Sequence, residues 1–236
     1  MFLIAQPVDL YRQFNGRLDF TAFGNTLNEF PNNGPLANCT PLDSSTATLA
    51  LTSGQTFESA HLYWGSVGTG DFEVDLNGTA VSAQRTFDHT FNGNPYFAAY
   101  AEVTDIVGAT GNGVYTFSEL DVSAIVGNYC GTDFAGWAIY VIYSDPSLRL
   151  NQISLFDGLE SVSANNTTLA ITLTNIDVTS DILSKIGFLA WEGEESIANG
   201  ESLLINGILI DNPPLNPGNN AFNGTNSYTG SSINYN

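Results

Sequence analysis

The sequence predicts an all-β protein: a β-sandwich with long loops, either jelly-roll-like or built from two packed, related sandwich units. An almost wholly apolar run over 136–143, opened by Gly and followed by Pro146, is typical of a strand buried on both faces. A helix is the alternative, but the run is short and Pro146 prevents its continuation. Residues 71–76 alternate acidic and apolar side chains, and Asn-Gly pairs starting at Asn77 and Asn206 are strong hairpin signals.

We expect 136–143 and the following run 151–157 to form the centre of the sandwich, the second run with one wet face. Residues 85–95 carry aromatics among Asn and Gly and are expected to be mostly a long loop. The remaining expected elements are an edge strand at 18–23, strands at 57–64, 71–76, 79–81, 96–103, 113–117, 120–122, 168–173 and 186–191, a hairpin over 202–210, and one helical turn at 103–107.

Composition divides the chain into four parts. Residues 1–5 are apolar and end in Ala before Gln6, as the remnant of a secretory signal peptide would. An N-terminal extension with an edge strand is expected over 6–44, and the β-sandwich core over 45–211. A Pro/Asn/Gly-rich tail or linker is expected over 212–236, where the chain would continue or meet another chain.

A similarity between the two halves of the sequence suggests two related units, about 45–130 and 131–211. In each half a Trp, Trp64 or Trp191, ends an apolar run next to Gly, and an acidic, Gly-containing loop and an Asn-Gly hairpin follow. The alternative is that ordinary strand and turn patterns have converged.

The chain is strongly acidic. It carries 24 Asp and Glu against 5 Lys and Arg, a net charge of −19. A basic surface for nucleic acid is excluded, because phosphate neutralisation needs Lys and Arg, and an anionic membrane would repel the chain. No apolar stretch reaches the length of a membrane-spanning helix. The charge fits salty, calcium-containing surroundings, and charge for solubility alone is the alternative.

Two cysteines, Cys39 and Cys130, lie far apart in the sequence. A disulfide between them would fit an exported protein and close a long loop, worth about 4 kcal/mol in the chain-entropy model. Two buried free thiols are the alternative.

Catalytic motifs are missing from the sequence. It has no Gly-x-Ser-x-Gly, no His-Glu-x-x-His and no P-loop. His61 lies in an apolar strand and His89 in an aromatic and polar loop, so we expect neither to act as a base. The sequence therefore predicts that the protein is not an enzyme.

Carboxylate side chains are the main polar groups available for binding a ligand. Asp71, Glu73 and Asp75 should project from one strand face, about 7 Å apart. A second group, Glu192, Glu194 and Glu195, shares a short loop with Gly193, which frees backbone carbonyls. Calcium binds six to eight such oxygens, so the hypothesis is one or more structural Ca²⁺ sites. Solvated acidic faces are the alternative.

Exposed aromatics offer a sugar-binding alternative. Phe91, Tyr96 and Tyr100 lie among Asn and Asp side chains, and could stack on a glycan and hydrogen-bond to it. Burial of these rings in the core is the competing interpretation.

Taken together, several stretches resemble one family. Residues 62–65, 70–79, 136–148, 156–158 and 186–193 are similar to the N-terminal region of very large Bacteroidota surface proteins, the SprB-type gliding-motility adhesins and their relatives. The similarity runs over roughly residues 15–225. It implies a chain exported by type IX secretion to the extracellular cell surface, as one part of a larger polypeptide or filament. It brings no catalytic residues.

Two function hypotheses follow. The first is a non-enzymatic, secreted cell-surface adhesin or filament module, acting in surface attachment or gliding motility, with other surface protein domains or glycans as partners. The alternative is a lectin-type carbohydrate-binding module. Structural calcium is the one cofactor expected.

Overall fold

The structure, a computed structural model, describes residues 6–30, 41–123, 134–176, 178, 184–196, 198–226 and 231–232. These residues form antiparallel sheets packed together and one short helix, which confirms the predicted all-β sandwich. Residues 1–5, Cys39 and Cys130 lie outside the described residues.

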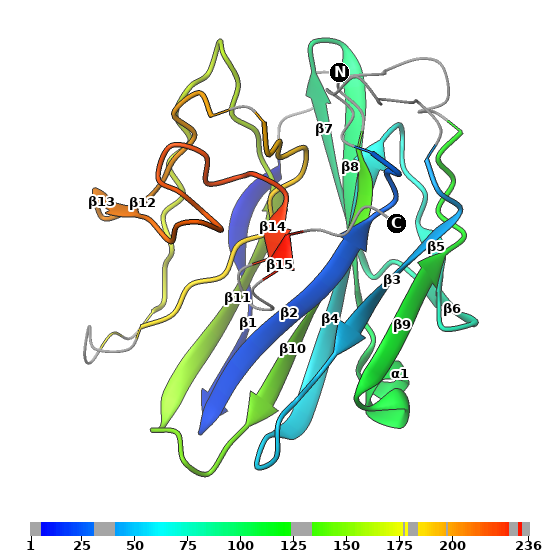
Figure 1. Cartoon of the computed structure of the whole chain (residues 1–236), viewed down its shortest axis with the longest axis vertical. Helices are drawn as coiled ribbons and strands as arrows, with labels where there is room; N and C mark the ends of the chain where they lie inside the picture. Colours follow the sequence, from blue (N-terminus) through cyan, green and yellow to red (C-terminus); the bar gives the residue numbers. More distant parts are fainter. Residues whose placement is uncertain are drawn as a thin grey trace.

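A five-stranded antiparallel sheet forms the middle of the molecule, in the order β2-β10-β4-β8-β7 (Figure 1). Its strands are β2 (Leu18–Thr26), β4 (Thr56–Val67), β7 (Arg85–Phe91), β8 (Asn94–Glu102) and β10 (Ala135–Ser144). The apolar run 136–143 is therefore a strand with a hydrogen-bonded neighbour on each side, as predicted. The edge position of β2 is also confirmed.

A four-stranded sheet packs against one face of this central sheet. It has the order β3-β9-β5-β6 and consists of β3 (Ser44–Leu49), β5 (Glu73–Leu76), β6 (Thr79–Ser82) and β9 (Gly113–Ser118). β5 and β6 join at Asn77-Gly78, both at positive φ, as the Asn-Gly signal predicted. The helix α1 (Thr104–Thr110) starts after Val103 and confirms the predicted helical turn.

The main core fills the space between these two sheets. Trp64 and Trp137 are paired across β4 and β10, and both are buried in it. The ring of Phe117 in β9 stacks on Trp137 at 5.4 Å, and the indole Nε1 of Trp137 donates to Ser45 Oγ in β3 at 2.9 Å. These buried aromatic side chains fill the space between the two sheets and thereby set the distance between them.

A two-stranded ribbon covers part of the other face. It pairs β1 (Gln6–Gly16) with β11 (Asn151–Leu159), and Tyr11 and Leu155 pack there on Tyr63 and Tyr100 of the central sheet. The expectation that 151–157 forms the centre of the sandwich together with 136–143 is therefore wrong, because this run belongs to the ribbon instead. β1 runs into β2 and β10 into β11, so the paired β2 and β10 continue into the β1–β11 ribbon, which folds back over the sheet as a unit.

The corner of this fold is held by hydrogen bonds. Asp145 N donates to Arg17 O at 2.9 Å, and Arg17 Nη1 donates to Leu148 O.

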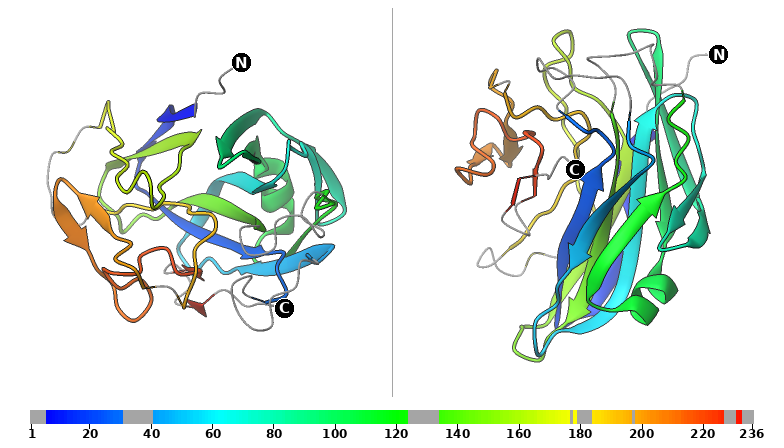
Figure 2. Two further views of the ribbon diagram at one scale, coloured as in Figure 1. Left: turned by 90° about the horizontal axis from the view of Figure 1, so that it is seen from above. Right: turned by 45° about the vertical axis from the view of Figure 1, so that its right-hand side comes forward.

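The C-terminal segment, which we define as residues 184–196 and 198–226, lies on the flank beside β2 and β10, away from the four-stranded sheet (Figures 1 and 2). It contains the hairpin β12 (Leu203–Ile205) and β13 (Ile208–Ile210), which turns at Asn206-Gly207 as predicted. The short strands β14 (Thr225–Asn226) and β15 (Ser231–Ser232) form one further pair.

Several sequence expectations are corrected by this arrangement. Residues 168–173 and 186–191 form no strand, since neither the alternating pattern of the first nor the apolar run of the second meets a partner backbone within the described residues. Residues 45–130 and 131–211 are not two separate sandwiches, because strands from both sides of this boundary share one sheet. Residues 6–44 are no separate extension, because Phe23 and Leu27 belong to the main core.

Two more corrections concern local elements. Residues 85–91 form the strand β7 rather than a loop, because Asn92-Gly93, at positive φ, makes a hairpin with β8. Residues 120–122 form no strand. Part of the predicted tail also packs, and Ala221 is buried.

We predict that Leu62→Ala in β4 lowers the free energy of unfolding by about 2–5 kcal/mol, because it leaves a cavity between the two sheets. Leu62 is 0% exposed. The matched control is Leu150→Ala, at 76% exposure, which should stay within about 0.5 kcal/mol of the unsubstituted chain. Urea unfolding measures both, and equal losses would contradict the assigned core.

Candidate functional site

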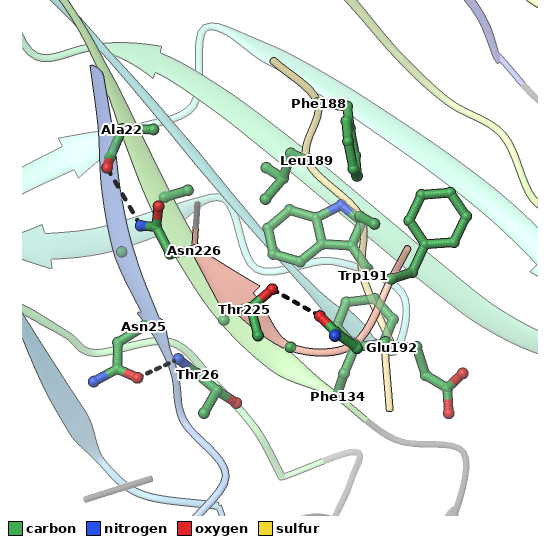
Figure 3. A pocket seen from close by; sticks show the side chains of 18 of the residues that line it. Ala22, Asn25, Thr26, Phe134, Phe188, Leu189, Trp191, Glu192, Thr225 and Asn226 are labelled. Atoms are coloured by element: carbon green, nitrogen blue, oxygen red, sulfur yellow. Dashed lines mark hydrogen bonds between the residues drawn. The ribbon is translucent and has the colours of Figure 1, made fainter. Parts of the chain in front are cut away.

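A groove of about 220 Å³ lies between the C-terminal segment and the outer face of β2 and β10 (Figure 3). We call it the groove throughout. One wall is the backbone and small side chains of β2 and β10, and the other comes from 186–194 and 221–226. Aromatic side chains, among them Phe134, Phe188 and Trp191, line the groove.

Glycines position the central side chain of the groove, Trp191. Gly65 of β4 and Gly136 of β10 lie opposite each other in register and leave a patch of the sheet without side chains. A Cβ built on Gly65 would lie 3.3 Å from the indole of Trp191 and 2.8 Å from Phe97 O. Trp191 therefore sits on the sheet because both paired positions lack a side chain.

A row of parallel rings extends from this tryptophan. Trp191 stacks on Phe134 with ring centroids 5.6 Å apart, and Phe134 stacks on Tyr96 at 6.0 Å. On the other wall Phe188 meets Phe222 edge to face at 5.4 Å. Offset or edge contacts of this kind hold rings in place and leave π faces to line a groove.

Amide and carboxylate groups surround these rings. Asn25, Thr26, Glu192 and Asn226 line the groove, and Asn226 Nδ2 donates to Ala22 O at 3.3 Å (Figure 3). Apolar walls with a few polar groups are the usual composition of a small-ligand site.

The outer edge of β2 is covered by side chains from three places in the chain. Its carbonyls Leu18 O, Phe20 O and Ala22 O accept hydrogen bonds from Asn151 Nδ2, Lys185 Nζ and Asn226 Nδ2. Lys185 also pairs with Asp19 at 2.8 Å. Such contacts occupy carbonyls that would otherwise be open to a strand from another chain.

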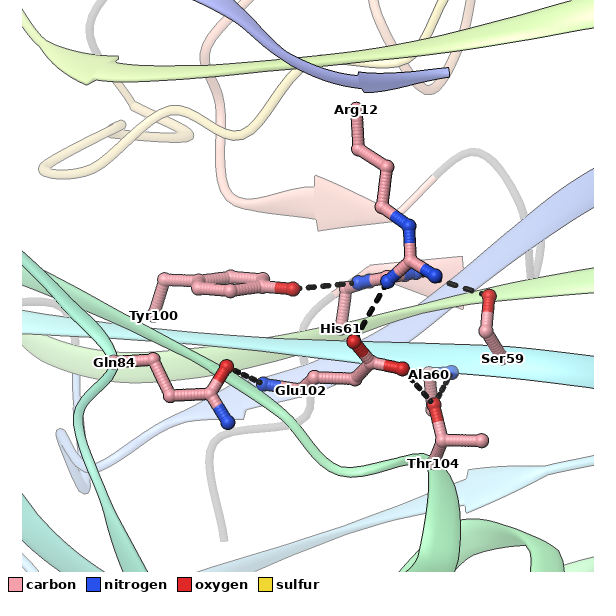
Figure 4. Close-up of polar contacts among 8 residues, drawn as sticks. All are labelled: Arg12, Ser59, Ala60, His61, Gln84, Tyr100, Glu102 and Thr104. Carbon is pink, nitrogen blue, oxygen red and sulfur yellow. Dashed lines mark hydrogen bonds and ion pairs between the residues drawn. The ribbon is translucent and has the colours of Figure 1, made fainter. Parts of the chain in front are cut away.

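A polar cluster lies between the central sheet and the ribbon (Figure 4). His61 is fully buried, with Ser59 Oγ 3.0 Å from Nε2 and Tyr100 OH 2.9 Å from Nδ1. Beside it, Arg12 Nη1 donates to Glu102 Oε2 at 2.7 Å. Burial lowers the pKa of His61 to about 4; Glu102 opposes this shift and Arg12 adds to it.

A second ion pair connects β7 to the ribbon. Arg85 binds Asp157 through two hydrogen bonds of 2.9 Å, and the Asp157 side chain is buried. The guanidinium of Arg85 also lies 4.5 Å from the ring centre of Tyr11. The polar atoms of His61 and Asp157 are thus engaged with neighbouring side chains.

The predicted acidic residues do not form one cluster. Asp71 precedes β5 and accepts from Glu73 N and Asp121 N, and Asp75 accepts from Gly78 N. They therefore serve the turns of the four-stranded sheet. Glu192, Glu194 and Glu195 belong to the C-terminal segment. No group of three or more His, Cys, Asp or Glu side chains among the described residues could hold a metal ion.

The predicted aromatic site is wrong for Tyr100, which is fully buried and therefore closed to a glycan. Tyr96 is half-buried against Phe134, and Phe91 lies at the end of the β7–β8 hairpin. Phe188 and Phe222 line the groove but were not expected at a binding site, because the sequence pattern predicts a strand around the first and a tail around the second.

No helix of the described residues has the length and apolarity needed to cross a membrane.

We predict that acid destabilises the protein through His61. The folded-state pKa lies below the ordinary value of 6.5, so this group's contribution is complete above pH 6.5 and is lost as the pH falls towards 4. The contribution amounts to about 3 kcal/mol. Urea unfolding at pH 7 and pH 4 should show a smaller loss for His61→Gln than for the unsubstituted chain. Glu102 and Arg12 are common to both proteins, so equal losses would contradict the prediction.

Comparison with protein-family models, with curated proteins and with solved structures finds no match to this chain.

Proposed function

We propose that this chain is a non-enzymatic, secreted cell-surface adhesin or filament module that acts by contact, in surface attachment or gliding motility. The observation that carries the proposal is the concentration of exposed apolar side chains in one part of the chain. The resemblance of its sequence motifs to gliding-motility adhesins supports the choice of setting.

Fourteen large hydrophobic residues are exposed among the described residues, and eleven of them lie between 162 and 209. They are Val162, Ile171, Leu173, Ile176, Val178, Ile186, Phe188, Leu189, Leu204, Ile208 and Leu209. Exposed apolar side chains on the surface of a protein, where they form a contiguous patch, mark a protein–protein or surface contact. Burying one such side chain contributes about 1.5–3 kcal/mol.

The rest of the chain supports this use. Two sheets and a ribbon pack together around two apolar clusters, while 160–202 carries a strand-like pattern without forming a named strand in the described residues. A packed body that presents an apolar segment suits a module whose task is to hold on to a neighbour. The acidic surface would limit unspecific association of copies with one another.

The test uses beads coated with the chain and counts those retained on glass under flow. The double variant Leu204→Ser and Ile208→Ser should reduce retention about tenfold, because it removes two apolar contacts. These side chains are 54% and 70% exposed, so the midpoint of thermal unfolding should change by only about 2 °C.

The control changes apolar residues of similar exposure elsewhere, Val114→Ser and Leu150→Ser, and should leave retention unchanged. If both double variants lost retention equally, the apolar side chains of 162–209 would not be the contact surface. Retention of the unsubstituted chain no better than that of albumin-coated beads would contradict the adhesin proposal itself.

A lectin-type carbohydrate-binding module is the second candidate, and the groove favours it. Aromatic faces bordered by Asn25, Glu192 and Asn226 suit a sugar, which offers an apolar face and hydroxyl groups.

On this candidate, the chain binds at least one oligosaccharide on a glycan array, and Phe188→Ala weakens that binding about tenfold by removing a stacking ring. Phe91→Ala, outside the groove, is the matched control and should bind as the unsubstituted chain does. Absence of binding, or equal loss in both variants, would exclude the groove as a glycan site.

A further inference from the structure

Two stretches of the C-terminal segment lie side by side at Glu201 and Asn220. These residues form a parallel β-bridge, and backbone hydrogen bonds flank it: Gly200 N donates to Asn219 O at 3.1 Å and Ala221 N to Glu201 O at 3.0 Å. Residues paired in a bridge direct their side chains to the same face. The carboxylate of Glu201 and the amide of Asn220 therefore share one face.

Each of these side chains has a buried oxygen with no hydrogen-bond partner among the described residues: Glu201 Oε2 and Asn220 Oδ1. Asn220 is only 4% exposed. Its Nδ2 donates to Glu195 O at 3.0 Å, which fixes the amide so that Oδ1 is the free atom. Leaving a buried acceptor unpaired costs about 1–3 kcal/mol, so two such oxygens on residues paired in one bridge require an explanation.

The surrounding charge is negative. Burial raises the pKa of Glu201, and the neighbouring Glu194 carboxylate raises it further. The ion pairs found in the described part of the chain lie elsewhere and do not include Glu201 or Glu194. They are Arg12–Glu102, Arg85–Asp157 and Lys185–Asp19. The unmet need at this position is therefore for positive charge close to oxygen atoms.

We propose that Glu201, Asn220 and Glu194 form a binding site for Ca²⁺. The available ligands are carboxylate and amide oxygens, which hard cations prefer, and Ca²⁺ accepts them in irregular geometry with waters completing its shell. Mg²⁺ requires near-ideal octahedral geometry and fits less well. The site holds only two carboxylates, so it does not form a group of three acidic side chains.

The site differs from the one expected from the sequence. Glu194 belongs to the predicted acidic loop, whereas Glu201 and Asn220 come from the hairpin region and the tail. The inference does not depend on the proposed adhesive function, and its test measures metal binding only.

A proton is the competing occupant. A protonated Glu201 could donate to Asn220 Oδ1 and satisfy both free oxygens with one hydrogen bond. The two occupants respond differently to calcium at neutral pH, and the experiment separates them.

Isothermal titration of the chain with CaCl₂ at pH 7.5 should show one site with a dissociation constant of about 10⁻⁴–10⁻³ M, and weaker binding of MgCl₂. Calcium should also raise the midpoint of thermal unfolding relative to EDTA. Glu201→Gln should abolish both effects, because it removes the buried charge. In EDTA this variant should be at least as stable as the unsubstituted chain, since its amide can donate to Asn220 Oδ1.

The matched control is Glu73→Gln, which removes one charge from an exposed position in the four-stranded sheet and should bind calcium normally. No heat and no thermal shift with the unsubstituted chain would overturn the proposal in favour of a protonated Glu201. Binding that Glu201→Gln and Glu73→Gln reduce equally would overturn it in favour of a general attraction of calcium to the acidic surface.

Discussion

The pairing of β4 with β10 is the constraint on which the rest of the structure depends. In this register Trp64 lies opposite Trp137 and Gly65 opposite Gly136. Alternation then places both indoles on one face, where they fill the core between the sheets, and both glycines on the other, where Trp191 lies on the sheet. A shift of the register by one residue would turn these side chains to the opposite face. It would disrupt both the core and the site of Trp191.

The C-terminal segment joins the sandwich mainly through side chains. Trp191 packs on the glycine patch, while Lys185 and Asn226 bind carbonyls on the outer edge of β2. This way of packing leaves a groove and leaves six large apolar side chains of the segment exposed, between 186 and 209. The same segment also carries the buried free oxygens of Glu201 and Asn220. The proposed adhesive contact, the proposed glycan site and the proposed calcium site therefore all involve this segment. The sandwich holds the segment in place.

Much of the sandwich could be predicted because its signals are local. Apolar alternation and Asn-Gly turns report the conformation of the few residues that carry them, as at Asn77 and Asn206. The strand expected at 186–191 does not form for a related reason: an apolar run shows that a segment can form a strand, but a sheet also needs a partner backbone. The six acidic residues were grouped by proximity in sequence, which cannot reveal that Asp71 and Asp75 serve turns.

By itself, the sequence determined an acidic all-β body with a central strand at 136–143, since composition and period-two patterning are properties of short stretches. Only the tertiary structure decided that β11 pairs with β1, that Tyr100 is buried and that Glu201 meets Asn220. These facts join residues far apart in the chain. Such contacts depend on which layers pack together, and no single stretch of the sequence determines the packing of the layers.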